Sequence, residues 1–222
     1  MQHSDSLRLS IQQRLDAASV QARDATDLRR AAVALVLVDA GFGADLPGFP
    51  QHARWSDDAA FLLTRRATTL ASHAGQWALP GGRIDAGETA EAAALRELHE
   101  ELGMALPSSS VLGRLDDYTT RSGYVITPFV VWAAAGAEPA LTLDAAEVAS
   151  AHRIPLTELL RQDAPLLDPP HQGHHQPVLR MPLGDHWVAA PTAAVLYQFC
   201  EWCLHGRPTR VAHFDQPRFT WR

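Results

Sequence analysis

A continuous apolar run near the start of the chain constrains its fold more than any other segment. Residues 31–40 read AAVALVLVDA, a stretch rich in valine and leucine with no polar residue before Asp39. Such a run lacks the alternation of a half-exposed strand and is typical of a strand covered on both faces. The sequence therefore predicts a β-strand here that is buried on both sides.

Periodicity and turn residues predict further elements on either side of this strand. Apolar residues at helical spacing indicate an amphipathic helix over residues 5–22, with Ser4 or Asp5 as its N-cap. Residues 41–59 hold three glycines and two prolines and predict a long loop. The other expected elements are strands at 60–66, 75–82, 111–120 and 124–135, a strand and then a helix within 147–160, an irregular stretch at 163–176, a hairpin at 178–190 and an apolar helix at 192–205. Because no internal repeat or boundary interrupts this series, we expect one domain over residues 1–222.

The segment GRIDAGETAEAAALRELHEELGM, residues 82–104, joins a glycine-containing loop to an acidic helix. Glu97, Glu100 and Glu101 are spaced i, i+3 and i+4 and share one helical face. We expect the opposite face to be a stripe that packs into the core, formed by Ala92, Leu95, Leu98 and Leu102. Gly103 fits the position just after the helix, where glycine adopts positive φ cheaply, and Met104 fits the hydrophobic contact beyond it.

The acidic face of this helix indicates a divalent cation. Like charges at these spacings cost roughly 0.2–0.5 kcal/mol per pair, and the helix C-terminus is the unfavourable end of the dipole for anions. Carboxylate oxygens are ligands that Mg²⁺ and Mn²⁺ prefer, and Gly82 would add a backbone carbonyl because glycine permits close approach. Glu88 and Arg96 would pair if the chain bends before the helix, and would brace the loop. The alternative is a surface helix with a solvated acidic face.

The fixed residues of this segment resemble those of the Nudix box, the signature of the Nudix hydrolase family. Every fixed position of that box is matched: Gly82, Glu88, Arg96, Glu97, Leu98, Glu100, Glu101, Gly103 and Met104. The resemblance implies a Nudix-type α/β/α sandwich with a mixed β-sheet, over a core of about residues 30–160, extended by the N-terminal and C-terminal helices. It also implies a metal-dependent hydrolase that cleaves the pyrophosphate bond of a nucleoside diphosphate derivative with Mg²⁺ or Mn²⁺.

The resemblance also implies roles for the box residues. Glu97 and Glu101 would be the principal metal ligands, Glu100 a further ligand or the general base, and Glu88 and Arg96 the braces of the loop. Glu147 stands in a loop before a predicted strand, where several such enzymes carry a catalytic or metal-binding glutamate. A solvated loop carboxylate is the alternative for Glu147. A nucleotide-sensing module with the same fold is the non-enzymatic alternative, although such modules typically lose box carboxylates, and here all are present.

Residues 62–82, LLTRRATTLASHAGQWALPGG, resemble the additional motif of the coenzyme A pyrophosphatase subfamily. The matching residues are Leu62, Leu63, Thr64, Arg66, Gly75, Pro80, Gly81 and Gly82, whereas Ala67, Ala71, Trp77 and Leu79 depart from the motif. Residues 116–130 resemble the same subfamily. The resemblance implies coenzyme A or acyl-coenzyme A as substrate, with Arg66, Arg65 and His73 as substrate contacts. ADP-ribose, dinucleoside polyphosphates and oxidised nucleotides remain the alternatives.

Composition excludes other classes of protein. The net charge of −6 disfavours nucleic-acid binding, and no apolar run is long enough to span a membrane. Two cysteines are too few for a disulfide framework, so we expect a cytoplasmic protein. We interpret Cys200 and Cys203 as buried structural thiols on a helix, and His171, His174 and His175 as part of a polar loop near the substrate. The aromatic tail with Phe214, Phe219 and Trp221 would pack across the body or against a second subunit, which leaves a homodimer open.

Overall fold

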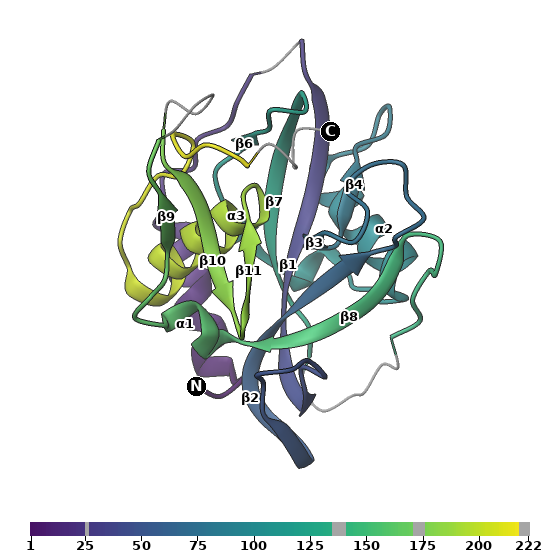
Figure 1. Ribbon diagram of the computed structural model, residues 1–222, viewed down its shortest axis with the longest axis vertical. Helices are drawn as coiled ribbons and strands as arrows, with labels where there is room; N and C mark the ends of the chain where they lie inside the picture. The colour runs from purple at the N-terminus through teal and green to yellow at the C-terminus, as the bar shows by residue number, and fades with distance from the viewer. Residues whose placement is uncertain (25–26, 135–140, 171–175, 218–222) are drawn as a thin grey trace.

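A mixed β-sheet forms the centre of the protein in the computed structural model, which describes residues 1–24, 27–134, 141–170 and 176–217 (Figure 1). Over these residues the sheet contains eight strands, in the order β3-β2-β1-β7-β5, with β4 paired to β1, β6 to β7 and β8 to β2. The strands are β1 Arg29–Gly43, β2 Gln51–Arg66, β3 Trp77–Ala78, β4 Gly81–Arg83, β5 Val111–Arg114, β6 Tyr118–Thr119, β7 Tyr124–Trp132 and β8 Val148–Pro155. The β1–β7 pair is parallel and the other pairs are antiparallel.

Helices and a smaller sheet cover the two faces of this central sheet. The α-helices are α1 Asp5–Asp16, α2 Ala90–Leu102 and α3 Thr192–Phe199, which continues into a π-helical segment, Cys200–His205. Short 3₁₀ helices occupy Ser108–Ser110 and Leu156–Leu160. The smaller antiparallel sheet has the order β11-β10-β9 and consists of β9 Leu166–Asp168, β10 Val178–Leu183 and β11 His186–Ala189. Among the described residues, no helix combines the length and apolar character that crossing a membrane requires.

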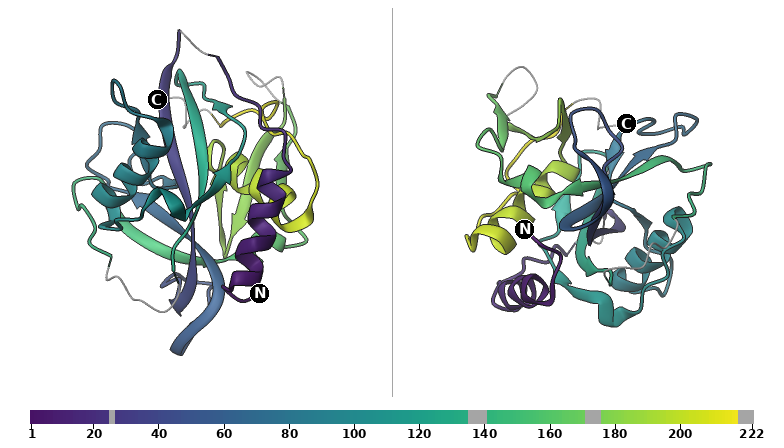
Figure 2. Two further views of the ribbon diagram at one scale, coloured as in Figure 1. Left: turned by 180° about the vertical axis from the view of Figure 1, so that it is seen from behind. Right: turned by 90° about the horizontal axis from the view of Figure 1, so that it is seen from below.

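The alternating side chains of β1 enter two separate hydrophobic cores. Ala34 and Val36 pack with Leu98 and Leu102 of α2 on one face of the sheet. Leu35 belongs to the other core, which also contains residues of α1, α3 and the smaller sheet. Figure 2 shows α1 and α2 separated by the strands of the central sheet. The prediction of a strand buried on both faces is confirmed, and so is the α/β class with a mixed sheet between helical layers.

The predicted loop at residues 41–59 is wrong. Strand β1 continues to Gly43 and β2 begins at Gln51, so only residues 44–50 connect the two strands. The glycines at 41 and 43 have φ of 58° and 108° and lie where the β1–β2 register shifts, which identifies them as bulge positions within the strand. Because residues 51–58 lie largely outside the core, they lack the apolar alternation from which a strand is recognised.

Smaller differences separate the other predicted elements from the observed ones. Helix α1 ends at Asp16, whereas the sequence predicted a helix to residue 22. The strand predicted at 75–82 is divided into β3 and β4 around Pro80, and the strand predicted at 111–120 is divided into β5 and β6. Strand β9 lies inside the stretch predicted to be irregular, residues 163–176. In α2, Ala92 is exposed, whereas Ala93 and Ala94 are buried, so the stripe that packs into the core is rotated and includes Glu101. The ends of α2 agree with the sequence: the Thr89 hydroxyl accepts the Ala92 N–H at 3.1 Å, and Gly103 has φ 71°.

Candidate active site

Three carboxylates meet between the C-terminal half of α2 and the loop before β8. Ligand oxygens of Glu97, Glu101 and Glu147 all lie within 4.8 Å of one another. The loop that carries Glu147 is fixed by its backbone: Ala67 N–H donates to the Glu147 carbonyl at 2.8 Å, and Asp144 N–H donates to the Glu101 carbonyl at 3.1 Å. We refer to Glu97, Glu101 and Glu147 as the carboxylate trio.

The carboxylate trio is electrostatically unfavourable when no cation is nearby. Glu101 is only 4% exposed, and its side chain accepts one backbone N–H, from Gly81 at 3.3 Å. Burial, reinforced by the charges of Glu97 and Glu147, raises the pKa of Glu101 to about 8. Burial likewise raises the pKa of Glu97 above its ordinary value, against the opposing effect of Arg96. A bound divalent cation would reverse both shifts, because it stabilises the ionised carboxylates.

Strand β4 brings its backbone against the carboxylate trio. A Cβ atom at Gly82 would lie 2.3 Å from Oε1 of Glu97, closer than any real contact, so a larger residue here would displace this carboxylate. The close approach that the sequence suggested for Gly82 is thus present, and it places the Gly82 backbone beside a carboxylate of the trio.

Arg96 fixes the loop before α2 to the helix. Its Nε and Nη2 donate to the two carboxylate oxygens of Glu88 at 3.0 and 3.1 Å, and Nη2 also donates to the Arg83 carbonyl at 3.0 Å. Hydrogen bonds from Arg96 hold the pKa of Glu88 below its ordinary value. Glu88 and Arg96 are eight residues apart but can contact each other, because Glu88 lies before the helix, whose N-cap is Thr89.

Glu100 lies apart from the carboxylate trio. Its carboxylate accepts Nη1 of Arg96 at 2.8 Å, and its side chain is 57% exposed. Arg96 Nη1 also donates to Oε1 of Glu97 at 3.0 Å, so one guanidinium joins Glu88, Glu97 and Glu100. The structure therefore brings Glu147, rather than Glu100, to the two carboxylates that the sequence assigned as principal ligands.

A cavity of about 590 Å³ borders β4 on the face of the sheet toward α3. Its walls come from β1, β4, β7, the loop before β3, and from β11 and the start of α3. Gly82 and Gly81 line it, and these residues also contact Glu97 and Glu101, so the cavity and the carboxylate trio meet at the two glycines of β4. The aromatic lining residues are Trp77, Tyr124 and Trp187, and the arginines are Arg29, Arg66 and Arg83.

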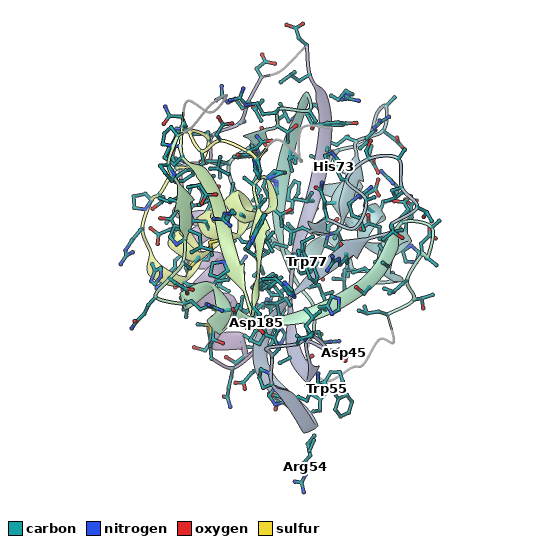
Figure 3. All side chains as sticks on the ribbon, in the orientation of Figure 1. Asp45, Arg54, Trp55, His73, Trp77 and Asp185 are labelled. Carbon is teal, nitrogen blue, oxygen red and sulfur yellow. The ribbon has the colours of Figure 1, made fainter. Side chains whose placement is uncertain are left out.

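Two of the three predicted substrate contacts line this cavity. Arg66 does so with a buried Nε that has no hydrogen-bond partner among the described residues, and its charge acts on Glu101. His73 lines the cavity from the loop before β3, the strand that begins at Trp77 (Figure 3), and burial lowers the pKa of its imidazole. Arg65 is not among the lining residues; its Nε donates to the Gly75 carbonyl at 3.0 Å and its guanidinium lies 5.0 Å from the Trp77 ring centroid.

Sequence reasoning missed the wall that the C-terminal part of the chain contributes. Trp187 and Ala189 of β11, with Thr192 and Val195 of α3, line the cavity opposite the sheet. Arg29, Arg83 and Tyr124 were also missed as lining residues, although Arg83 lies inside the acidic segment and Tyr124 inside residues 116–130. A lone arginine or tryptophan carries no positional signal until strand pairing is known.

The other sequence features have structural roles where the structure describes them. Cys200 and Cys203 are free and buried, and burial raises the pKa of each thiol to about 12, which suits inert thiols. Phe214 of the tail packs on the body, since its carbonyl accepts the Tyr118 hydroxyl at 3.1 Å. The residues His171, His174, His175, Phe219 and Trp221 lie outside the described residues.

Comparison with known proteins identifies the family of this chain. The NUDIX domain family matches residues 53–179, more than half of the chain. The chain is 36% identical over 142 residues to the uncharacterized Nudix hydrolase NudL of Photorhabdus laumondii, a match that covers 63% of this chain and 75% of that protein. It is 35% identical over 143 residues to NudL of Cronobacter sakazakii, covering 63% and 72%. Among solved structures, the MutT protein of Methanosarcina mazei aligns with a TM-score of 0.42 and 19% identity over 64% of this chain and 83% of that chain. The chain belongs to the Nudix domain family and is a Nudix hydrolase.

Proposed function

We propose that this Nudix hydrolase cleaves the pyrophosphate bond of coenzyme A or its acyl derivatives with Mg²⁺ or Mn²⁺. Water adds across the P–O–P linkage, so the products are 3′,5′-ADP and 4′-phosphopantetheine or its acyl form. The observation that carries this proposal is the meeting of an arginine-lined cavity with the carboxylate trio at Gly81 and Gly82.

The residues of the carboxylate trio fit a divalent cation. Their donor set is entirely carboxylate, which suits Mg²⁺ or Mn²⁺, and Glu101 is buried with one backbone hydrogen bond among the described residues. We assign Glu97, Glu101 and Glu147 as metal ligands, with the Gly82 carbonyl as a further ligand. When bound, the ion would neutralise charge that develops on the phosphate oxygens. Glu100 is retained as a candidate base or outer ligand, and Glu88 and Arg96 as the residues that position the loop.

The cavity suits a nucleotide of the size of coenzyme A's ADP half. Its volume of about 590 Å³ lies within the range of ligand pockets, roughly 300–1,000 Å³. Its lining combines arginines, which bind phosphates through planar N–H forks, with aromatic rings on which a base can stack. Arg66, at the end of β2, would contact the pyrophosphate, because it lines the cavity and its buried Nε has no partner among the described residues; His73 would contribute from the loop before β3. Arg65 is held by Gly75 and Trp77 and would act only by positioning Trp77.

Product analysis over a substrate panel tests this assignment. Purified protein with Mg²⁺ is incubated with coenzyme A, ADP-ribose, a dinucleoside polyphosphate and an oxidised nucleotide, and the products are separated by chromatography. We expect kcat/KM for coenzyme A to exceed that for ADP-ribose by at least about tenfold, a difference of ~1.4 kcal/mol. Equal or faster turnover of ADP-ribose would contradict the proposed substrate. The Glu97→Gln variant serves as the control for contaminating hydrolases.

We also propose that residues 1–222 act as one Nudix hydrolase domain. The core on the α3 side of the sheet contains residues of α1, β1, β10 and α3 together, so the terminal extensions share apolar contacts with the central sheet. A single cooperative unfolding transition, with coincident loss of secondary and tertiary signals, is the expected result. Two separated transitions would contradict it.

A further inference from the structure

Two arginines gather around one tyrosine in the wall of the cavity. The guanidinium carbon of Arg29 lies 4.0 Å from the Tyr124 ring centroid, and that of Arg83 lies 5.8 Å from it. Arg83 Nε also donates to the Tyr124 hydroxyl at 2.9 Å. All three residues line the cavity.

Strand register produces this cluster. Arg29 of β1 pairs with Tyr124 of the parallel strand β7, and Arg83 of β4 pairs with Ala31, two residues further along β1. Paired residues and residues two apart point to the same face of a sheet. Three adjacent strands therefore present the three side chains on the cavity face, independently of loop conformation.

The charges of these two arginines are not neutralised by protein carboxylates. Among the described residues, neither Arg29 nor Arg83 forms an ion pair with an aspartate or glutamate. Arg29 donates from Nη2 to the Ser122 carbonyl at 2.7 Å, and Arg83 uses Nε, so other N–H groups of both guanidiniums remain for a ligand. Arg96 is the contrast within the same chain, since its guanidinium contacts three glutamates.

A phosphomonoester has the chemistry that this cluster would recognise. Such a group carries about −1.5 to −2 charges near neutral pH and presents three oxygen acceptors. Two guanidiniums held on rigid strands supply matching charge and donors at little conformational cost. Tyr124 orients both arginines, Arg29 through the cation–π contact with its ring and Arg83 through the hydrogen bond that its hydroxyl accepts.

We propose that Arg29 and Arg83, oriented by Tyr124, form a phosphomonoester subsite that binds the 3′-phosphate of the substrate's ADP half. This subsite rests on the proposed function, because the 3′-phosphate distinguishes coenzyme A from nucleotides with a free 3′-hydroxyl. It acts in recognition and is separate from Arg66, the cavity arginine whose charge acts on Glu101. Tyr124 is a positioning residue in this assignment.

Substrates that differ only in the 3′-phosphate test the subsite kinetically. Wild-type protein, Arg29→Gln and Arg83→Gln are compared on coenzyme A and 3′-dephospho-coenzyme A, after circular dichroism shows that each variant is folded. We expect the wild-type ratio of kcat/KM for the two substrates to be at least about ten, and to fall toward one in both variants. The matched control is Arg54→Gln, which removes an exposed arginine at the far end of the β1–β2 hairpin, away from His73 and Trp77 (Figure 3), and retains the ratio. A ratio that survives in both variants overturns the subsite.

A binding measurement separates failure of the subsite from failure of the proposed function. Calorimetric titration with 3′,5′-ADP and with 5′-AMP requires no turnover and uses the wild type first. We expect 3′,5′-ADP to bind at least about tenfold more tightly, and this advantage to disappear in Arg29→Gln and Arg83→Gln. If coenzyme A is not hydrolysed but the advantage exists and depends on these arginines, the proposed function fails and the subsite stands. If the wild type binds the two nucleotides equally, the subsite is wrong whatever the enzyme hydrolyses.

Discussion

The carboxylate of Glu97 lies directly against the Cα of Gly82, where an added Cβ would be 2.3 Å from Oε1 and 2.5 Å from the carboxyl carbon. Unlike most glycines in the chain, Gly82 does not have positive φ, so its backbone conformation is open to any residue. The effect of a side chain at this position is therefore steric, because its Cβ would push the Glu97 carboxylate of α2 away from the β4 backbone.

Substitution of Gly82 by alanine is expected to displace Glu97 and abolish most activity. A shift of about 1 Å in a catalytic group can lower the rate by roughly a hundredfold, so we expect a loss of that size in kcat/KM. Gly87→Ala is the matched control: Gly87 has φ 83° but no atom within 4 Å of an added Cβ, so its substitution strains the backbone without touching Glu97. Equal losses of activity in the two variants would show that contact with Glu97 is not the cause.

The four glutamates near the site are expected to differ in importance. Glu97→Gln, Glu101→Gln and Glu147→Gln each remove a charge from the carboxylate trio, and we expect turnover to fall by about a hundredfold or more in each. Glu100→Gln removes an exposed partner of Arg96 and should have a clearly smaller effect. Steady-state kinetics over a range of Mg²⁺ concentrations provides the comparison. A larger loss for Glu100→Gln than for Glu147→Gln would overturn the assignment of Glu147.

Divalent cations are expected to stabilise the fold through the carboxylate trio. Ligand at a hundred times its Kd contributes ~2.7 kcal/mol to the free energy of unfolding. For a chain of this length that corresponds to a rise in Tm of roughly 5–10 °C. Differential scanning fluorimetry with Mg²⁺ and with chelator measures the shift. Glu101→Gln should reduce the shift, whereas an unchanged shift would place the responsible ion elsewhere.

The contribution of His152 to stability is expected to be lost as the pH is lowered from about 7 to 5, opposite in sign to the contributions of Glu97 and Glu101, whose raised native pKa values favour the folded state at lower pH. This imidazole is buried in the native state, with Nδ1 2.8 Å from the Ala44 carbonyl and Nε2 2.7 Å from the Ser150 hydroxyl. Burial lowers its native-state pKa below the ordinary value of 6.5. The unfolded chain therefore takes up the proton first, and the contribution is fully present above pH 6.5 and lost as the pH falls toward the native pKa.

Urea unfolding at several pH values checks this dependence. The variant His152→Gln keeps a hydrogen-bonding side chain that does not titrate, so its free energy of unfolding at pH 5, relative to that at pH 7, should be higher than in the wild type. Burial also lowers the pKa values of His3 and His73, so these residues still contribute to the pH dependence of the free energy of unfolding in the variant. An identical slope in the two proteins would mean that His152 does not contribute.

The sequence predicted local structure more reliably than it predicted side-chain partners. The apolar run at 31–40 identified β1 because a strand that is buried on both faces consists almost entirely of apolar residues. Thr89 and Gly103 were recognisable ends of α2, because caps depend on nearest neighbours. The extension of β2 to Gln51 was missed because an exposed strand lacks the apolar alternation from which strands are predicted. The glycines of its partner strand β1 are typical of loops, but here they occupy β-bulges.

The composition of the site depended on contacts that helical spacing cannot determine. Spacing placed Glu97, Glu100 and Glu101 on one face, but the difference of 100° between neighbouring residues buries Glu101 and exposes Glu100. Glu147 joins them from a loop that two backbone hydrogen bonds hold in place. Ala67 N–H donates to the Glu147 carbonyl, and Asp144 N–H donates to the Glu101 carbonyl. The cluster of Arg29, Arg83 and Tyr124 arises from strand register over nearly a hundred residues, which no local pattern encodes.

The cavity wall formed by β11 and α3 lies far from the acidic segment in the chain, although the two regions border one site. The side of the cavity that β11 and α3 form can therefore change without any substitution in residues 82–104. Exchange of residues 186–195 with those of a related enzyme would reshape that side and leave the carboxylate trio and the Arg29–Arg83–Tyr124 cluster as they are. Two enzymes of this kind can thus differ in the shape of the cavity while they share the same acidic helix.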